Sequence, residues 1–251
     1  MRPPDLEQGR FFLKDTVRLL VDFSQTEQQR GLPPPPLQKS YAPDARRIPL
    51  PSPEEWQGIA PLALQRAIGE RASRRRYTER PLKLDELAFL LWATQGVRSQ
   101  VDEGTALRTV PSAGCRHAFE THLAVMRVEG LEQGVYRYLP LGHELLFEFA
   151  EQRLPGALTE ATLGQNFVGA AAAVFCWTAV PARMEWRYGA AAHKVIALDA
   201  GHICQNLYLA CEAIGAGCCA VAAYHQEFFD RLLRVDGNEE FTVYLAPVGK
   251  V

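Results

Sequence analysis

Leu198 to Tyr224 reads LDAGHICQNLYLACEAIGAGCCAVAAY, and this stretch decides the fold. Apolar side chains recur here at steps of three and four residues, which predicts a helix with a deep apolar face. They belong to Ile196, Ala200, Ile203, Cys204, Leu207, Cys211 and Ile214. The opposite side carries Asp199, His202 and Asn206 among alanine and leucine, so we expect the helix to be buried nearly all round. In that setting His202 is expected to be a hydrogen-bonded core residue rather than a catalytic base.

Gly215 and Gly217 are expected to end this helix, and the small residues from Cys218 to Tyr224 predict a strand. The segment from Gly215 to Ala220 also matches G-x-G-x-x-A, the dinucleotide-binding fingerprint. That fingerprint requires a strand before it and a helix after it, and the order here is reversed. The Rossmann interpretation is therefore excluded. Backbone that turns on glycines into small side chains instead allows close approach to a flat ligand.

Length and composition predict one sizeable core. The chain has 251 residues, 47% of them apolar, and a formal net charge of -2 that gives no general attraction to nucleic acid or an anionic membrane. The longest apolar run, residues 168–182, is interrupted by Pro181 and is too short to span a bilayer. Residues 1–14 lack the apolar segment of a signal peptide, so we expect a cytoplasmic protein.

The cysteines also fit a reducing compartment. Most of them lie in apolar stretches, where reduced cysteine behaves as a small hydrophobic residue; these are Cys176, Cys204, Cys211, Cys218 and Cys219. There is no C-x-x-C pair and no matching histidine spacing, so no metal site is predicted. The adjacent Cys218 and Cys219 leave a vicinal redox pair as an alternative.

The first part of the chain, residues 1–55, is predicted to be a proline-rich arm, and residues 56–251 the folded domain. An amphipathic piece, Phe11 to Phe23, leads into Gly31-Leu-Pro-Pro-Pro-Pro36 and further prolines. Such proline density favours extended, semi-rigid chain that can lie across a preformed surface. A proline-rich motif that recognises a partner protein is the alternative.

The domain mixes helices and strands without strict β-α-β alternation, which predicts the α+β class. Expected helices cover residues 62–68, 84–94, segments of 158–167, and 226–233, besides the long helix. Expected strands are 121–128, 135–139, 145–149, 172–178 and 241–247, the first two forming a hairpin.

A basic run after the first of these helices is a candidate phosphate site. Arg71, Ser73 and Arg75 occupy alternate positions, so in an extended segment their side chains point the same way. Two guanidinium groups and a hydroxyl suit a phosphate. A solvated basic face is the alternative; a nucleic-acid patch is disfavoured because Glu70 and Glu79 flank the run and the net charge is negative.

Two further segments are candidates for a site. Pro111-Ser-Ala-Gly114 is a turn in which proline sets the entry and glycine allows close backbone approach, although an ordinary loop explains it equally. Glu185-Trp-Arg-Tyr-Gly189 precedes the long helix. Its Tyr188 is either a proton donor or a packed ring with a satisfied hydroxyl.

Taken together and in this order, these pieces resemble the nitroreductase superfamily of FMN enzymes, and within it the SagB/ThcOx-type dehydrogenase branch. The resemblance runs over residues 65–250, and its specificity lies in the ordered set. The matching pieces are Arg71-x-Ser73-x-Arg75, Lys83 to Gly96, Pro111 to Gly114, Gly134 to Tyr138, Trp186 to Gly189, Asp199 to Leu209, Gly215 to Gly217 and Pro247 to Lys250.

The resemblance implies a nitroreductase fold, with a mostly antiparallel sheet flanked by helices, and an obligate homodimer with two FMN sites at the subunit interface. It implies that the phosphate and ribityl chain are held by Arg71, Ser73 and Arg75, with Lys250 as a further candidate. It implies that the partner's flavin is reached by Pro111, Ser112, Ala113 and Gly114. Backbone near the flavin N5 edge is expected from Gly217, Ala220, Val221, Ala222 and Ala223.

The resemblance also implies catalytic roles for Tyr188 and Arg187. By this resemblance, azoline-oxidising relatives use a Lys-Tyr pair at the position where this chain has Arg187-Tyr188. An arginine, with a pKa above about 12, does not accept a proton, so Tyr188 would have to manage it with Arg187 as an electrostatic helper. The functions left open are oxidation of a peptide-derived azoline, NAD(P)H-dependent reduction of nitro or quinone-type acceptors, and a non-catalytic complex subunit.

Overall fold

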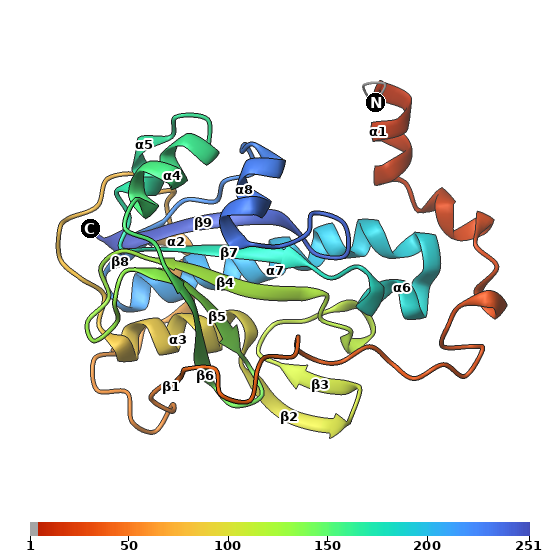
Figure 1. Cartoon of the computed structure of the whole chain (residues 1–251), viewed down its shortest axis with the longest axis horizontal. Helices are drawn as coiled ribbons and strands as arrows, with labels where there is room; N and C mark the ends of the chain where they lie inside the picture. Colours follow the sequence, from red (N-terminus) through yellow and green to blue (C-terminus); the bar gives the residue numbers. More distant parts are fainter. Residues whose placement is uncertain (1–4) are drawn as a thin grey trace.

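A seven-stranded sheet, in which every pairing is antiparallel, forms the centre of the molecule (Figure 1). The computed structural model describes residues 5–251; residues 1–4, the beginning of the predicted arm, lie outside the described residues. The strand order is β1-β6-β5-β4-β7-β9-β8. The strands are β1 (Arg47–Pro49), β4 (Phe119–Val125), β5 (Gly134–Leu139), β6 (Glu144–Ala150), β7 (Ala173–Ala179), β8 (Ala216–Cys218) and β9 (Phe241–Lys250). The predicted α+β class is confirmed.

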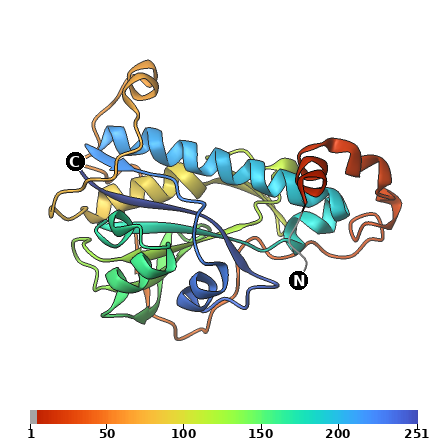
Figure 2. The ribbon, with the colours of Figure 1, turned by 90° about the horizontal axis from the view of Figure 1, so that it is seen from above.

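Helices cover both faces of this sheet, as the view from above shows (Figure 2). One face carries α3 (Leu84–Gln95) and the long α7 (Ala192–Ala213), whose Leu91 and Leu207 are fully buried in the larger core. The other face carries α4 (Leu154–Ala161), α5 (Asn166–Gly169) and α8 (Gln226–Leu233), packed on a second apolar cluster. Because helices cover both faces, the central strands β4, β5 and β7 are buried at every position, and apolar residues recur along the helices that cover them.

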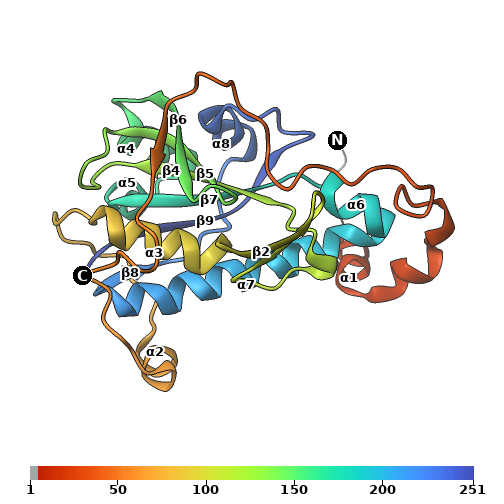
Figure 3. The ribbon, with the colours of Figure 1, turned by 90° about the horizontal axis from the view of Figure 1, so that it is seen from below.

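The remaining elements lie around this frame. A separate hairpin joins β2 (Val97–Asp102) to β3 (Thr105–Arg108), and α6 (Ala182–Tyr188) leads into α7. Short α2 (Leu64–Glu70) stands away from the body beside α7 (Figure 3). None of the helices in residues 5–251 combines the length and apolar character needed to cross a membrane.

The predicted hairpin between the strands near residues 121 and 139 is confirmed, because Val125 pairs with Gly134 and His122 with Arg137. The predicted strand from Cys218 to Tyr224 is wrong beyond its first residue. Strand β8 ends at Cys218, and only one isolated bridge, Val221 to Leu245, follows. The amide of Ala220 donates to the Tyr208 hydroxyl at 2.9 Å, so it has no free donor for a strand partner.

The expectation that α7 is buried nearly all round is wrong for one stripe. Leu198 is 53% exposed and the His202 side chain 51% exposed, and Ala197, Gly201 and Gln205 continue the same exposed stripe. His202 is therefore not a core histidine. Its Nδ1 lies 3.8 Å from the Asp199 carboxylate, beyond hydrogen-bonding distance. The sequence carries no charge on this face to signal exposure.

The proline-rich arm combines a projecting end with an anchored middle. Helix α1 (Leu6–Leu13) extends away from the body (Figure 1). Further along, Lys39 donates its backbone amide to buried Glu120 at 2.7 Å, and Arg137 donates to the Lys39 carbonyl at 2.9 Å. Residues 47–49 then join the sheet as edge strand β1, so the arm is tied to the domain by hydrogen bonds along its second half.

Candidate functional site

The basic run forms an extended segment that crosses the end of β8. Ser73 forms a parallel bridge with Cys218, and the amide of Arg74 donates to the Cys218 carbonyl at 2.9 Å. Because adjacent side chains of an extended segment alternate, Arg71, Ser73 and Arg75 are placed on one side of it. No salt bridge within residues 5–251 engages either Arg71 or Arg75, so both guanidinium groups are available to an anion.

Tyr208 joins this segment to the loop that follows β8. The Tyr208 hydroxyl lies 2.9 Å from the Ser73 hydroxyl and accepts the amide of Ala220 at 2.9 Å. The guanidinium of Arg71 lies over the Tyr208 ring, 5.4 Å from its centroid. Sequence reasoning missed Tyr208. The signal was present, because Tyr208 lies between Cys204 and Cys211 on the buried face and a buried phenol needs a polar partner.

The side chain of Arg74, between Ser73 and Arg75, explains why position 217 is a glycine. A β-carbon at Gly217 would lie 2.7 Å from Cβ and 2.6 Å from Cδ of Arg74, closer than packed atoms come. Gly217 thus allows the basic segment to lie against β8. The Nε atom of Arg74 is buried and has no hydrogen-bond partner within the described residues. Because adjacent side chains of an extended segment point to opposite sides, Arg74 faces away from the side shared by Arg71, Ser73 and Arg75.

The loop from Ala220 to Ala223 lies beside the same segment. Its Val221 is buried and exchanges both backbone hydrogen bonds with Leu245, at 2.8 and 3.1 Å, whereas Ala222 and Ala223 are exposed. Burial raises the pKa of the neighbouring Cys219 thiol, and contacts with Arg75 and Ser73 oppose that shift. The structure thus brings the predicted phosphate segment and the predicted flavin-edge loop together.

Lys250 does not take the predicted role. Its side chain is 6% exposed, and its ammonium pairs with the carboxylate of Glu86 and donates to the carbonyl of Ile214. Adjacent side chains of a strand point to opposite faces. Gly249 faces Tyr77 of the basic segment's continuation, so Lys250 points the other way, into the layer between β9 and α3.

The two other predicted segments, far apart in sequence, meet at Gly114. This residue has a φ of +59°, and a β-carbon there would lie 2.6 Å from the Tyr188 hydroxyl and 2.9 Å from Nε of Arg187. Arg187 is exposed and engages in no salt bridge within residues 5–251. Tyr188 ends α6 rather than lying in a loop, and Gly189 with a φ of +51° terminates that helix.

Asp199 and His117 hold the turn that contains Gly114. Burial raises the pKa of Asp199 on α7, while the Ser112 hydroxyl and the Ala113 amide oppose the shift. The amide of His117 donates to the Ser112 hydroxyl at 2.9 Å. Burial lowers the pKa of His117 to about 3, so it is neutral at physiological pH. The Asp199 carboxyl group and the His117 amide thus support the turn from two sides, while the His117 imidazole hydrogen-bonds to the Ala106 carbonyl of β3 at 3.1 Å.

Within one chain, the residues around Gly114 and the residues of the basic segment contact α7 at different positions along its length. Asp199 marks the level of Gly114 and Tyr188, and Tyr208 that of the basic segment. The two are nine residues apart, about 13 Å along the helix. The exposed stripe of α7 lies between them.

A cavity of about 940 Å³ adjoins Arg187 and Gly114. Its other walls are the tip of the β2–β3 hairpin, residues 102–105, and three prolines of the arm. The wall residues from the arm are Pro33, Pro34 and Pro36. This cavity is the concave site nearest to the predicted catalytic pair.

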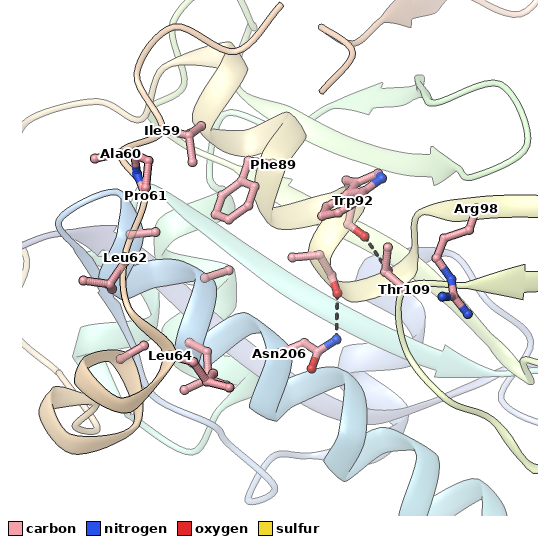
Figure 4. Close-up of a pocket in the computed structure, with 15 residues that line it drawn as sticks. Ile59, Ala60, Pro61, Leu62, Leu64, Phe89, Trp92, Arg98, Thr109 and Asn206 are labelled. Carbon is pink, nitrogen blue, oxygen red and sulfur yellow. Dashed lines mark hydrogen bonds between the residues drawn. The ribbon is translucent and has the colours of Figure 1, made fainter. Parts of the chain in front are cut away.

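A second hollow, an apolar groove of about 590 Å³, runs between α2, α3 and α7 (Figure 4). Phe89 and Trp92 line it from α3, and Asn206 from α7 donates to the Ala93 carbonyl at 2.8 Å across its floor. Leu64 on its rim is 65% exposed. The groove offers apolar surface and few groups that carry chemistry.

Comparison with known proteins identifies the architecture. Residues 68–250 match the model of the nitroreductase family. The nitroreductase-family protein MJ1384 of Methanocaldococcus jannaschii is 31% identical over 207 residues, which is 82% of this chain and 98% of that protein. A nitroreductase-family crystal structure from Ralstonia eutropha JMP134 superposes with a TM-score of 0.68 at 25% identity, covering 88% of this chain and 99% of that one.

More distant structures share the fold alone. The E. coli microcin synthetase McbBCD complex, with truncated pro-MccB17 bound, contains a chain that matches with a TM-score of 0.60 at 16% identity, covering 100% of this chain and 98% of that one. A nitroreductase-family structure from Desulfovibrio desulfuricans, in complex with FMN, matches with a TM-score of 0.51 at 15% identity, covering 76% and 87%. The expected nitroreductase fold is confirmed.

Proposed function

The chain belongs to the nitroreductase family, and from that premise we propose that it is a homodimeric, FMN-dependent oxidoreductase that passes an electron pair through flavin N5. The observation that carries the proposal is the convergence of Arg71, Ser73 and Arg75 beside a loop of small residues. Both guanidinium groups are free of salt bridges within the described residues, which suits a phosphate.

The residues present fit FMN. Two guanidinium groups and a hydroxyl on one side of the segment are a donor set that suits a phosphate, and the exposed Ala222 and Ala223 leave space beside it for a planar ring. When bound, the flavin supplies a reversible two-electron acceptor at N5. Arg71 and Arg75 would bind its phosphate, and Ser73 would hold the adjoining chain while anchored to Tyr208.

A dimer follows from the separation of the two groups along α7. Two copies of α7 packed antiparallel through the stripe of Leu198, Gly201 and Gln205 would place Gly114 of one chain near the basic segment of the other. The stripe is apolar or uncharged and contains a glycine, which permits close helix approach. The exposed apolar rim at Leu64 is further surface that a second copy would cover.

Tyr188 is the proposed proton donor or acceptor. Arg187 beside it carries a guanidinium group, whose role would be to stabilise negative charge on the phenol or on the substrate. Oxidation of an azoline to an azole removes a hydride and a proton, so it needs a proton acceptor as well as the flavin. The finer proposal is SagB-type oxidation of a peptide-derived azoline, in which the phenolate form of Tyr188, stabilised by Arg187, would take the proton and become the phenol.

A second candidate is a reductase that passes electrons from NAD(P)H to nitro or quinone-type acceptors. The exposed Arg187, which forms no salt bridge within residues 5–251, favours it, because a guanidinium group stabilises charge on an acceptor better than it removes a proton. The third candidate, a subunit without chemistry, predicts a flavin site with no turnover.

One spectroscopic series tests these alternatives. The absorbance spectrum of purified protein should show bound flavin, released as FMN on denaturation. Anaerobic mixing with NADH or NADPH should bleach the flavin rapidly for a reductase, and an azoline-containing peptide should bleach it for a dehydrogenase. Absence of flavin binding by the purified, FMN-supplemented protein would remove the proposal.

A further inference from the structure

We propose that the proline-rich segment Pro33–Pro36 is a wall of the substrate site, and that it makes the site select elongated, peptide-derived substrates over small single-ring acceptors. The inference deepens the proposed function and rests on it, because the site of reaction is taken to be the Arg187–Tyr188 pair. It gives the arm a role in specificity beyond wrapping the domain.

The cavity beside the reactive pair supplies the first part of the argument. It holds about 940 Å³, near the upper end of the range for small-molecule sites. Arg187 and Gly114 form one side, the arm prolines a second and the hairpin tip at residues 102–105 a third. A single aromatic ring at Arg187 would leave most of this volume empty, whereas an extended chain attached to that ring would fill it.

The arm and the hairpin are in tight contact where they close the cavity. Gly104 at the hairpin tip is buried against Pro34, and a β-carbon there would lie 2.2 Å from Cγ and 2.8 Å from Cβ of that proline. A proline ring has no flexible end that could move aside. Any side chain at Gly104 must therefore displace the arm itself and change the shape of the cavity.

Hydrogen bonds hold the arm in place on both sides of this contact. Before it, the indole of Trp186 donates to the Leu32 carbonyl at 2.9 Å. After it, buried Arg108 donates to the Leu37 carbonyl at 2.9 Å, and Lys39 is bound by Glu120. Residues 32–39 thus form a fixed wall rather than a mobile tether, and a fixed wall can discriminate by shape.

The chemistry of the walls also suits a peptide. The prolines offer apolar rings, and their peptide nitrogens carry no hydrogen. Exposed Asp102 and Glu103 stand at the hairpin tip and Arg187 at the reactive end, so the cavity carries opposite charges on two of its walls. A peptide can pack apolar side chains on the proline rings, and its amide donors and carbonyl acceptors can bond to the carboxylates and to Arg187.

Two acceptors with the same reducible group test the proposal. 4-Nitrobenzamide is compared with a 4-nitrobenzoyl tripeptide amide, using FMN-loaded protein reduced anaerobically with dithionite and followed by flavin reoxidation in stopped flow. Each nitro group takes two electrons and two protons to give a nitroso group and water, so no nicotinamide is required. We expect the half-saturation concentration to be about ten-fold lower or more for the peptide.

Variants at the contact assign the effect to the arm. Gly104→Ala should raise the half-saturation concentration about ten-fold for the peptide and leave that for 4-nitrobenzamide unchanged. Pro34→Ala, which removes the proline ring from the wall, should likewise raise the half-saturation concentration for the peptide only. Gly156→Ala is the matched control, because its β-carbon would have no neighbour within 4 Å. If Gly104→Ala does not fold, Pro34→Ala alone tests the wall.

A binding measurement gives a readout apart from turnover. Calorimetric titration of oxidised, FMN-loaded protein with the unreactive benzoyl tripeptide amide should show binding that Gly104→Ala weakens. The inference would be overturned by equal half-saturation concentrations for the two acceptors. It would also be overturned if neither arm variant changed the half-saturation concentration for the peptide. Failure to bind FMN, or reoxidation by neither acceptor, would count against the proposed function instead.

Discussion

The hydroxyl of Tyr188 lies 2.6 Å from the position that a β-carbon would occupy at Gly114. This contact joins the end of α6 to a turn more than seventy residues earlier, and it leaves no room for a side chain. Gly114 also has a φ of +59°, which disfavours any other residue. The Tyr188 phenol proposed to move a proton and the turn proposed to reach the partner's flavin are therefore positioned as one unit.

Gly114→Ala should reduce turnover at least ten-fold, because the new methyl group must displace the Tyr188 hydroxyl. It should also lower stability by about 1 kcal/mol through the positive φ. Gly130→Ala is the matched control, since Gly130 has a φ of +79° and open space around its β-carbon position. Melting temperature and steady-state rates separate the two effects: both variants should lose stability, and only Gly114→Ala should lose activity.

Tyr188→Phe should lower turnover by about 100-fold, the usual effect of removing a positioned acid or base. FMN content and melting temperature should stay close to those of the parent protein, because the ring remains. Arg187→Lys should raise azoline oxidation if that is the reaction, since a lysine, unlike an arginine, can serve as a general base. A fully active Tyr188→Phe would show that the tyrosine is a packing residue.

Arg71→Ala and Arg75→Ala should each weaken FMN binding by about 1.5–3 kcal/mol, or roughly ten- to a hundred-fold, through loss of a charge-assisted contact to phosphate. Arg76→Ala is the control, because it removes the same charge from the same run at a position that alternates away from the other two. Fluorescence titration of the apoprotein with FMN measures all three. Equal FMN affinities for the three variants would mean that the charge of the run matters in general and that Arg71 and Arg75 make no specific phosphate contact.

Leu198→Glu should convert the protein to a monomer and abolish FMN retention, because a buried carboxylate in the proposed α7 contact is strongly unfavourable. Leu141→Glu, at a residue 42% exposed in the turn between β5 and β6, should leave both properties unchanged. Sedimentation velocity with detection at flavin wavelengths measures mass and cofactor together. A folded monomer of the parent chain that retains FMN would refute the dimeric site.

His117 should make stability sensitive to acid. Burial lowers its folded pKa from 6.5 to about 3, so its contribution is complete above pH 6.5 and is lost as pH falls from 6.5 toward 3. By pH 5 the loss is about 2 kcal/mol. His117→Asn suits the φ of +47° and cannot titrate, so it should start less stable and flatten this slope. Denaturant unfolding between pH 7.5 and 4.5 compares the two slopes.

Local pattern accounts for most of the correctly predicted elements. The periodic apolar residues from Ile196 to Ile214 predicted α7, and the alternation of Arg71, Ser73 and Arg75 predicted their shared side in an extended segment. The strand predicted at Cys218 to Tyr224 failed because the Ala220 amide bonds to Tyr208, a residue on another element. Composition alone cannot report such a competing partner.

The site residues also divide into features that the local sequence indicated and contacts that only the tertiary structure revealed. Arg187 and Tyr188 stood out in sequence, but their contact with Gly114 did not. Lys250 looked like a phosphate ligand, and the structure pairs it with Glu86 on α3. The pairs between Arg137 and Lys39 and between Arg183 and Glu120 were invisible, because charged residues in strands and helices ordinarily face solvent.

The sequence by itself determined the class of fold, the long helix with the main strands before and after it, and the residue types that a phosphate and a proton transfer require. Those features depend on backbone geometry over a few residues, which periodicity and turn chemistry report directly. Tertiary structure alone decided that the arm borders the cavity at Pro34, that Tyr208 links Ser73 to Ala220, and that one stripe of α7 stays exposed. Each of these depends on strand register and helix packing between segments distant in sequence, and no local pattern encodes that register.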